Sequence, residues 1–203
     1  MNTNTIITIG RQYGSGGRLI GKKLADELNI PFYDKELLTI ASKESGINEE
    51  LFVTHDEKPT NSFLYSLVMG SYNGTELPLN HKLFLAQFDA IKKIASEGPC
   101  VIVGRCADYA LEDFPNCINI FIHASMKSRI ERVTKNYNIP IEKAEETILK
   151  IDKKRAKYYS FYSNKKWGEA SNYHLTFDSS ILGIDNCVEL IKDFVQKTEL
   201  NRG

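Results

Sequence analysis

A glycine-rich stretch near the N-terminus has the residue types that bind phosphate. Residues 9–21 read IGRQYGSGGRLIG, with glycines at positions 14, 16 and 17. The β-branched run of residues 5–10 leads into this stretch, and an amphipathic helical pattern follows it. Glycines let backbone N–H groups turn inward onto an anion, and a helix N-terminus adds partial positive charge. The pattern predicts a phosphate-binding loop; the alternative is a tight structural turn without a ligand.

This loop departs at two positions from the phosphate-loop sequence G-x-x-x-x-G-K-[ST]. Gly17 falls where the lysine is expected, and Arg18 falls where the magnesium-binding serine or threonine is expected. Arginine supplies charge and bidentate hydrogen bonds to phosphate, although it is bulkier and planar. We therefore predict that Arg18 is a phosphate ligand, the alternative being a surface arginine on the first helical turn. The helix dipole slightly disfavours a cation there, which favours an anion nearby.

A second buried strand, residues 100–105, also ends in Gly-Arg. Because open α/β sheets bind ligands at the carboxyl ends of their strands, we expect Arg105 to point into a crevice. The alternative is a structural ion pair with a neighbouring helix. Asp108 follows three residues later. It could orient Arg105, bind a base or ribose group, or cap the next helical turn.

Asp34 ends a short predicted strand, residues 30–34, and directly precedes a predicted helix. Its carboxylate could bind an acceptor hydroxyl, hold a metal-bound water, or cap the helix that begins at Lys35. From the residues alone capping is favoured, because aspartate before a helix is a frequent N-cap.

Residues 152–167, DKKRAKYYSFYSNKKW, combine basic and aromatic side chains. Arg155 in this segment could bind phosphate through its guanidinium. One alternative is a surface ion pair between Asp152 and Arg155, which are three residues apart on a helix. The other is nucleic-acid binding, since such side chains can stack on bases. The formal net charge of the whole chain is zero, which disfavours that partner.

Strand patterns alternate with helical patterns along the chain, which predicts a parallel α/β sheet covered on both faces. The helix after residue 80 is clear, and Asn80 is its candidate cap. Residues 47–80 mix turn residues with apolar ones and are interpreted as helix fragments and a mobile loop.

The bulk composition is that of one globular domain. The chain has 203 residues, of which 42% are hydrophobic. It shows neither a signal-peptide pattern nor an apolar run of about 18 residues, so we expect a cytoplasmic protein without a membrane partner. No metal site is expected from the residues, since the cysteines lack a C-x-x-C pair and the histidines lack metal spacing.

Several stretches together resemble the cytidylate kinase-like family in order and spacing. They are YGSGGR, PFYDKELL, VIVGRCADYAL, and IDKKRAKYY followed by FDSSILGID. The resemblance extends over essentially the whole chain, 1–203. It implies a single-domain, three-layer α/β P-loop NTPase fold with a core of about 1–46 and 98–203. It also implies a small acceptor-binding lobe of about 47–97 and a lid of about 152–168.

The same resemblance implies a function, an ATP-dependent nucleoside monophosphate kinase that uses Mg²⁺ and has small-molecule nucleotides as partners. It places donor phosphates on Gly14, Ser15, Gly16, Gly17 and Arg18, and the acceptor on Asp34, Arg105 and Asp108. It assigns the transferring phosphate to Arg18, Arg105 and Arg155. The departure at residues 17 and 18 leaves open a non-catalytic nucleotide-binding or regulatory module, or a kinase for a different small acceptor. Neither the acceptor nor the oligomeric state follows from the sequence.

Overall fold

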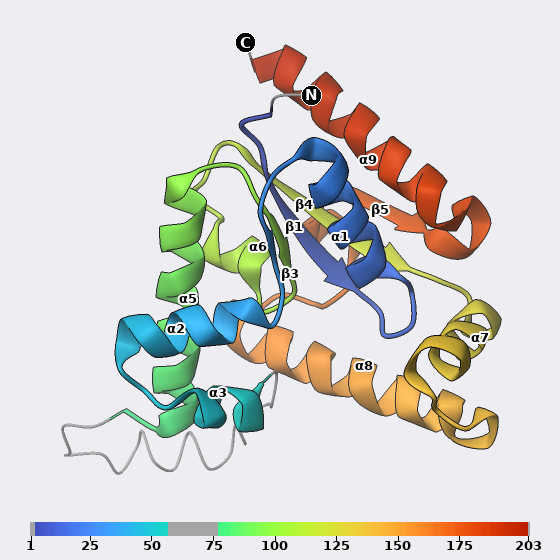
Figure 1. The fold of residues 1–203 in the computed structure, drawn as a ribbon, viewed down its shortest axis with the longest axis horizontal. Helices are drawn as coiled ribbons and strands as arrows, with labels where there is room; N and C mark the ends of the chain where they lie inside the picture. The colour runs from blue at the N-terminus through green and yellow to red at the C-terminus, as the bar shows by residue number, and fades with distance from the viewer. Residues whose placement is uncertain (1–2, 57–76, 203) are drawn as a thin grey trace.

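Five parallel strands form the centre of the molecule. The structure, a computed structural model, describes residues 3–56 and 77–202. The strands are hydrogen-bonded in the order β2-β3-β1-β4-β5, and each adjacent pair is parallel (Figure 1). Their bounds are β1 (Ile6–Arg11), β2 (Phe32–Tyr33), β3 (Val101–Val103), β4 (Cys117–His123) and β5 (Leu175–Asp178). The first strand of the chain therefore lies at the middle of the sheet, and its carboxyl end opens at the centre of one edge.

Helices cover both faces of this sheet. In Figure 1, α1 and α9 lie on one side, α2, α5 and α6 lie on the other, and α7 and α8 cross the edge where the strands end. The helices are α1 (Gly17–Leu28), α2 (Glu36–Ser45), α3 (Glu49–His55), α5 (Leu79–Glu97), α6 (Ala107–Ala110), α7 (Met126–Tyr137), α8 (Ile141–Ser163) and α9 (Ser179–Arg202), with a short 3₁₀ turn η1 (Ala170–Asn172). None of the helices in the described part of the chain is long and apolar enough to span a membrane.

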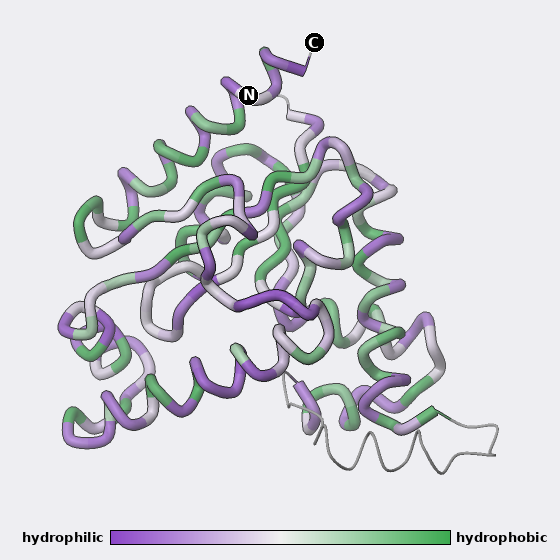
Figure 2. Tube along the Cα trace, turned by 180° about the vertical axis from the view of Figure 1, so that it is seen from behind, coloured by the Kyte–Doolittle hydropathy of each residue, from purple (hydrophilic) through white to green (hydrophobic). Residues whose placement is uncertain are grey.

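The alternation of side chains along β1 divides the core into two layers. Ile7 and Ile9 are buried in the cluster that contains Leu24 of α1 and Ile191 of α9. Ile6 points to the opposite face and is buried with Ile91 of α5. This is the period of two that a strand buried on both faces requires. Figure 2 shows the result, with hydrophobic residues concentrated in the central strands and α8 largely hydrophilic.

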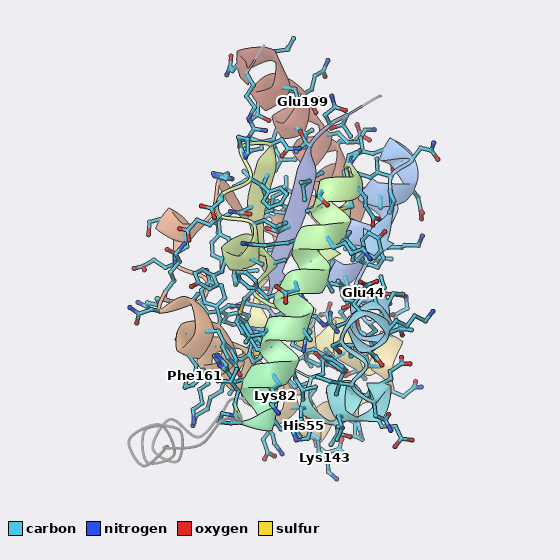
Figure 3. The ribbon with its side chains drawn as sticks, turned by 90° about the vertical axis from the view of Figure 1, so that its left-hand side faces the viewer. Glu44, His55, Lys82, Lys143, Phe161 and Glu199 are labelled. Carbon is cyan, nitrogen blue, oxygen red and sulfur yellow. The ribbon has the colours of Figure 1, made fainter. Side chains whose placement is uncertain are left out.

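The face covered by α5 is also where the chain leaves the sheet to build a second layer of helices. Figure 3 views this face, with α5 in front of the sheet and Glu44 of α2 and His55 of α3 beside it. An ion pair of 2.8 Å between Lys93 Nζ and a Glu44 carboxylate oxygen joins α5 to α2. A buried cluster around Phe52 of α3 and Leu83 of α5 completes the contact. The segment 36–55 is thereby fixed to α5.

The two ends of the described chain are fastened together. Glu199, near the end of α9, accepts hydrogen bonds from the Thr3 and Thr5 hydroxyls at 2.5 and 2.7 Å and from the Asn4 amide at 3.1 Å. Burial of the Glu199 carboxylate alone would raise its pKa, but these hydrogen bonds outweigh burial and the pKa is lowered. The start of β1 is therefore held to the last turns of α9.

Most predicted elements are present, with two corrections. The helix predicted after residue 80 begins at Leu79, and Pro78 occupies its N-cap, so the assignment of Asn80 as cap is wrong. Proline is favoured at helix starts because it lacks the N–H group that would be unsatisfied there. The strand predicted over residues 30–34 contains only Phe32 and Tyr33. Within residues 47–80 the helix fragment α3 is confirmed, and the mobile loop predicted there falls mainly on residues 57–76, outside the described residues.

The two-layer core generates a stability prediction. Ile191 of α9 has no exposed surface, whereas Leu200 on the same helix is 75% exposed. Ile191→Ala should lower the free energy of unfolding by about 3 kcal/mol, because it removes transfer free energy and leaves a cavity. For a chain of this length this is a fall of about 6–12 °C in the melting temperature, measured by circular dichroism. Leu200→Ala is the control and should melt within about 2 °C of the wild type. Equal melting of the two variants would contradict this description of α9.

Candidate functional site

A cleft lies at the sheet edge where β1 ends. It has a volume of about 450 Å³, within the range of small-molecule sites. The loop between β1 and α1 forms one wall, and the others are formed by residues that follow β2, α3 and β3 and by residues of α7 and α8. The lining residues are Arg11, Gln12, Tyr13, Gly14, Gly16, Gly17, Arg18, Asp34, Lys35, Asp56, Arg105, Tyr137 and Arg155. A smaller cavity beside it shares Arg11, Arg105 and Arg155 and continues toward Trp167.

The glycine loop, residues 12–17, needs glycine for steric reasons. Gly14 and Gly16 have φ of +77° and +84°, a region that glycine adopts readily and other residues rarely. The surroundings are also crowded: a Cβ atom at Gly14 would lie 2.9 Å from Val133 Cγ1, and one at Gly16 would lie 2.7 Å from Ile184 Cδ1. The strand, loop and helix predicted from the sequence are present, and Gly16 is the N-cap of α1.

Three successive carbonyls of the loop are held from outside it. Arg129 Nε donates to the Tyr13 carbonyl at 2.7 Å, Arg132 donates to the Gly14 carbonyl at 2.6 Å, and the Ser179 hydroxyl donates to the Ser15 carbonyl at 2.5 Å. In a planar trans peptide the following N–H points opposite to the carbonyl. These bonds therefore aim the amides of residues 14, 15 and 16 away from α7 and α9.

Two loop amides also have partners inside the loop. Ser15 N donates to the Gln12 carbonyl at 3.2 Å, and Gly17 N donates to the Ser15 hydroxyl at 3.3 Å. Both distances are at the long end for N–H···O bonds, so these amides are weakly held. Within the turn formed by residues 14–17, the Ser15 and Gly17 amides therefore have only weak partners.

The lid region predicted at residues 152–168 begins inside α8 and contacts the glycine loop directly. Asp152 accepts a hydrogen bond from the Tyr13 amide at 2.7 Å and forms a buried ion pair with Arg129. Asp152 therefore pairs with Arg129 of α7, whereas the alternative considered from the sequence was a surface ion pair with Arg155. Arg155 NH1 donates to the Arg11 carbonyl at 3.3 Å, and its guanidinium lies 5.7 Å from the centre of the Tyr13 ring.

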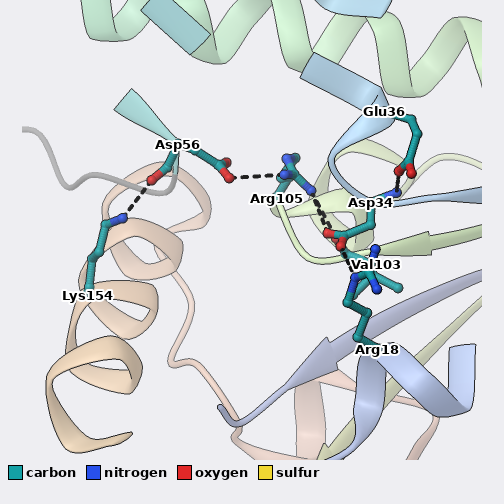
Figure 4. Close-up of polar contacts among 7 residues, drawn as sticks. All are labelled: Arg18, Asp34, Glu36, Asp56, Val103, Arg105 and Lys154. Atoms are coloured by element: carbon teal, nitrogen blue, oxygen red, sulfur yellow. Dashed lines mark hydrogen bonds and ion pairs between the residues drawn. The ribbon is translucent and has the colours of Figure 1, made fainter. Parts of the chain in front are cut away.

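Asp34 lies between two arginines (Figure 4). Its carboxylate accepts from Arg18 Nε at 2.6 Å and from Arg105 NH1 at 3.2 Å. The Asp34 and Arg105 side chains are only 7% and 2% exposed, whereas that of Arg18 is 55% exposed. The interpretation of Asp34 as a helix cap is wrong, because Lys35 is the N-cap of α2 and no side-chain cap is present. The two guanidiniums compete successfully for this carboxylate because a charged hydrogen bond is stronger than one to an amide.

The ionic contacts continue from Arg105 across the cleft. Arg105 NH2 lies 3.1 Å from Asp56 at the end of α3, and Lys154 of α8 donates to the Asp56 carbonyl at 2.7 Å (Figure 4). The structural ion pair considered for Arg105 is therefore present, and Arg105 lines the cleft as well. Its backbone is in the left-handed region, with φ of 54°, which costs energy for a non-glycine residue.

The charges around Asp34 control its ionisation. Burial alone would raise the pKa of this carboxyl, but the hydrogen bond from Arg18 and the positive charges of Arg105 and Arg11 outweigh it. The pKa of Asp34 is consequently lower than its ordinary value of 3.8. Asp34 is an anion at neutral pH and a weak proton acceptor.

Asp108 lines the smaller cavity. It is in the first turn of α6, and its carboxylate accepts a hydrogen bond from the Tyr159 hydroxyl at 2.6 Å. Cys106 is the N-cap of this short helix, so the capping alternative for Asp108 is not supported. Burial raises the pKa of Asp108, partly opposed by the Tyr159 hydrogen bond.

The sequence matches a known family over most of this fold. The profile of the cytidylate kinase-like family matches residues 6–181, which include the glycine loop, Asp34, Arg105 and Arg155. The chain belongs to the cytidylate kinase-like family. A cytidylate kinase from Methanocaldococcus jannaschii is 25% identical over 203 residues, 95% of this chain and 99% of that protein. This member is therefore a phosphotransferase that acts on a nucleotide or another small molecule.

Solved structures confirm the fold. An uncharacterized protein from Eubacterium ventriosum is 29% identical with a TM-score of 0.71, covering 95% of this chain and 98% of its own. A shikimate kinase from Bacteroides thetaiotaomicron has a TM-score of 0.56 at 15% identity, with 95% and 98% covered. A gluconokinase from Sinorhizobium meliloti has a TM-score of 0.53 at 14% identity over both full chains. The predicted three-layer α/β P-loop fold is confirmed.

Several residues of this kinase-like site were not found from the sequence. Arg11 is the last residue of β1 and Arg105 comes two residues after β3, each directly after a glycine, and that parallel was an available signal. Arg129 and Arg132 lie on α7, where they look like ordinary charged surface residues. Asp56 falls in the weakly patterned region 47–80, which gave no signal at all.

The buried carboxylate generates a prediction. Asp34→Asn removes the charge that compensates Arg105, and should lower the free energy of unfolding at neutral pH by about 3 kcal/mol. The pKa of Asp34 is lowered by folding, so its stabilisation is present above the unfolded pKa and lost as pH falls through the folded pKa. The difference in melting temperature between wild type and variant should therefore shrink below pH 3.8.

The matched control is Asp26→Asn, which removes an exposed carboxylate that pairs with Lys22 on the surface of α1. Exposed pairs contribute about 0–1 kcal/mol, so this variant should melt close to the wild type. A melting temperature of Asp34→Asn equal to that of Asp26→Asn at pH 7 would show that the buried pair does not stabilise the fold.

Proposed function

We propose that this protein transfers the terminal phosphoryl group of ATP to a nucleoside monophosphate, with a pyrimidine nucleotide such as CMP as the acceptor. The observation that supports this most is the charge of the cleft. Five cationic side chains line it, Arg11, Arg18, Lys35, Arg105 and Arg155, against the two carboxylates Asp34 and Asp56. An excess of positive charge suits two phosphorylated substrates that must approach each other.

The state of Asp34 favours a phosphate acceptor over a hydroxyl acceptor. A hydroxyl nucleophile must lose its proton, which calls for a general base with a pKa near the working pH. Asp34 has a lowered pKa and is held by two guanidiniums, so it is a weak base. An acceptor phosphate oxygen is already ionised: it forms the new bond to the γ-phosphorus while the bond to the β–γ bridging oxygen breaks. ADP leaves, and the acceptor needs no proton removed.

The proposed roles follow the arrangement of the cleft. The amides of Gly14, Ser15, Gly16 and Gly17 would hold the donor phosphates at the start of α1. Arg105 and Arg155 would bind and stabilise phosphate charge between donor and acceptor. Asp34 and Arg18 would border the acceptor side, and Asp108 would contact the acceptor through the smaller cavity. Residues 47–97 would form the acceptor-binding lobe, and residues 152–168 the lid.

Magnesium fits this site as an ion that arrives on the substrate phosphates. Within residues 3–56 and 77–202, no group of three or more His, Cys, Asp or Glu side chains could hold a metal ion. Mg²⁺ commonly keeps several waters and uses one or two carboxylates together with phosphate oxygens. Asp34 and Asp56 line the cleft and could reach its water shell. When bound, the ion would neutralise phosphate charge.

A second function is favoured by specific features of the glycine loop. Gly17 and Arg18 replace the usual lysine and hydroxyl residue, and the Ser15 and Gly17 amides already have partners within the loop. A loop of this kind suits a nucleotide-binding or regulatory module without turnover. Binding is common to both functions, so only turnover separates them.

The test is ADP formation by the purified protein with ATP, magnesium and a panel of nucleoside monophosphates, shikimate and gluconate. Turnover is expected with CMP, dCMP or UMP, and not with the two hydroxyl acceptors. Arg155→Ala should lower kcat by about 10²–10³-fold, because it removes a donor to developing phosphate charge.

Lys150→Ala is the matched control, because it removes an exposed cation on the same helix, outside the proposed lid of residues 152–168. It should retain wild-type turnover. ATP binding without turnover of any monophosphate would reject the kinase proposal in favour of the regulatory module, and turnover of a hydroxyl acceptor alone would reject the phosphate acceptor.

A further inference from the structure

The missing lysine of the glycine loop leaves a defined space at Gly17, and another side chain lies over it. Gly17 is the first residue of α1, and it stands where the lysine of a phosphate loop is expected. A Cβ atom at Gly17 would lie 2.6 Å from Arg11 Cβ and 3.2 Å from Arg11 Cγ. The stem of Arg11 therefore passes over the point from which a lysine side chain would extend.

Arg11 also lines the cleft that the glycine loop borders. Arg11 is the last residue of β1, at the carboxyl end of the central strand. It lines both the large cleft and the smaller cavity, and its charge contributes to the lowered pKa of Asp34. Its backbone carbonyl accepts a hydrogen bond from Arg155, so the two arginines are adjacent.

Arg18 is directed elsewhere. Its Nε donates to Asp34 at 2.6 Å, and its guanidinium lies 5.9 Å from the centre of the Phe32 ring. Both partners belong to the segment that follows β2 or to β2 itself, on the acceptor side of the proposed site. Arg18, next to the lysine position in the sequence, is thus held toward Asp34, while Arg11, seven residues earlier, lies against Gly17.

We infer that Arg11 replaces the loop lysine, so that the cation on the donor β- and γ-phosphates comes from the end of β1. This inference deepens the proposed function and rests on ATP being the donor. It also accounts for the glycine at position 17: any side chain there would collide with the Arg11 stem. The arginine at the end of β1 and the glycine at the start of α1 are therefore linked. The strand supplies the cation, and the helix position that usually supplies it has no side chain.

The first test measures affinity for ATP and for AMP by calorimetry, without an acceptor. Arg11→Met keeps the stem but removes the charge, and should weaken ATP binding about 10-fold or more by losing charge-assisted hydrogen bonds to phosphate. AMP lacks β- and γ-phosphates, so its affinity should stay within about twofold. A merely structural role would weaken both nucleotides alike. Arg11→Lys should recover part of the ATP affinity, and the surface variant Lys22→Ala should bind as the wild type does.

The second test is an exchange of the two positions. Gly17→Lys alone should lose ATP affinity and melt at a lower temperature, because its Cβ has no room beside Arg11. Arg11→Gly combined with Gly17→Lys removes the collision and restores the usual lysine. The double variant should therefore bind ATP more tightly than either single variant. If the fold-loss of ATP affinity in the double variant equals the product of the fold-losses in the two single variants, the inference is wrong.

Other outcomes separate this inference from the proposed function. ATP affinity retained in Arg11→Met but lost in Arg18→Ala would show that Arg18 is the substitute, even with CMP turnover intact. Selective loss of ATP affinity in Arg11→Met, in a wild type that turns over no monophosphate, would reject the proposed function and support this inference. A wild type without measurable ATP affinity would overturn both.

Discussion

The position of one buried carboxylate governs the geometry of the cleft. Arg105 is almost fully buried, and a buried guanidinium is tolerated only with compensating charge and hydrogen bonds. Asp34 supplies both and simultaneously holds Arg18 of α1, while Asp56 takes the other side of Arg105 and connects through its carbonyl to Lys154. The ends of β2 and β3, the first turn of α1, the end of α3 and the middle of α8 are thus fixed to one another by electrostatics. The apolar core holds the sheet, but it does not by itself set the distances across the cleft.

A second set of arginines, on α7, holds the glycine loop in its conformation. Arg129 and Arg132 hold loop carbonyls, and Asp152 both neutralises Arg129 and accepts from the loop itself. The loop is therefore shaped by α7 and α8, which come more than 100 residues later in the chain. Arginines in this molecule have two distinct uses. Some orient backbone dipoles and never need to meet a ligand, whereas others present their own charge in the cleft. The loop amides that the first group of arginines orients are preorganised, so they need no rearrangement when an anion arrives.

The fold and the position of the cleft could be predicted from the sequence, whereas most of the contacts within the cleft could not. The strand-loop-helix pattern, the Gly-Arg ending of residues 100–105 and the basic segment 152–167 each indicated one wall, since strand ends in a parallel sheet meet at one edge. Local rules failed where distant residues intervened. Asp34 has the sequence pattern of a helix cap, but its carboxylate pairs with two arginines from other elements. Asn80 was predicted as a cap, but the N-cap is the proline two residues before it. Ile130 and Val133 mark the buried stripe of α7, but the pattern does not show that Arg129 and Arg132 bind carbonyls of the glycine loop. Such pairings depend on tertiary contacts that no local pattern encodes.

The attachment of β1 to α9 has a consequence for how the protein is made. Thr3 and Glu199 are 196 residues apart in the chain, and β1 also needs β3 and β4 on its two sides before its hydrogen bonds are satisfied. A ribosome produces the chain from its N-terminus at about 5–20 residues per second. The strand that leads into the glycine loop therefore emerges before β3, β4 and the end of α9, which hold it in place. The last residue of β4 follows Arg11 by more than 100 positions, so for about 5–20 seconds of synthesis the β-branched strand is present before both neighbouring strands exist. Chaperones that cover nascent strands would act on this protein chiefly through β1, whose last residue, Arg11, later lines the cleft.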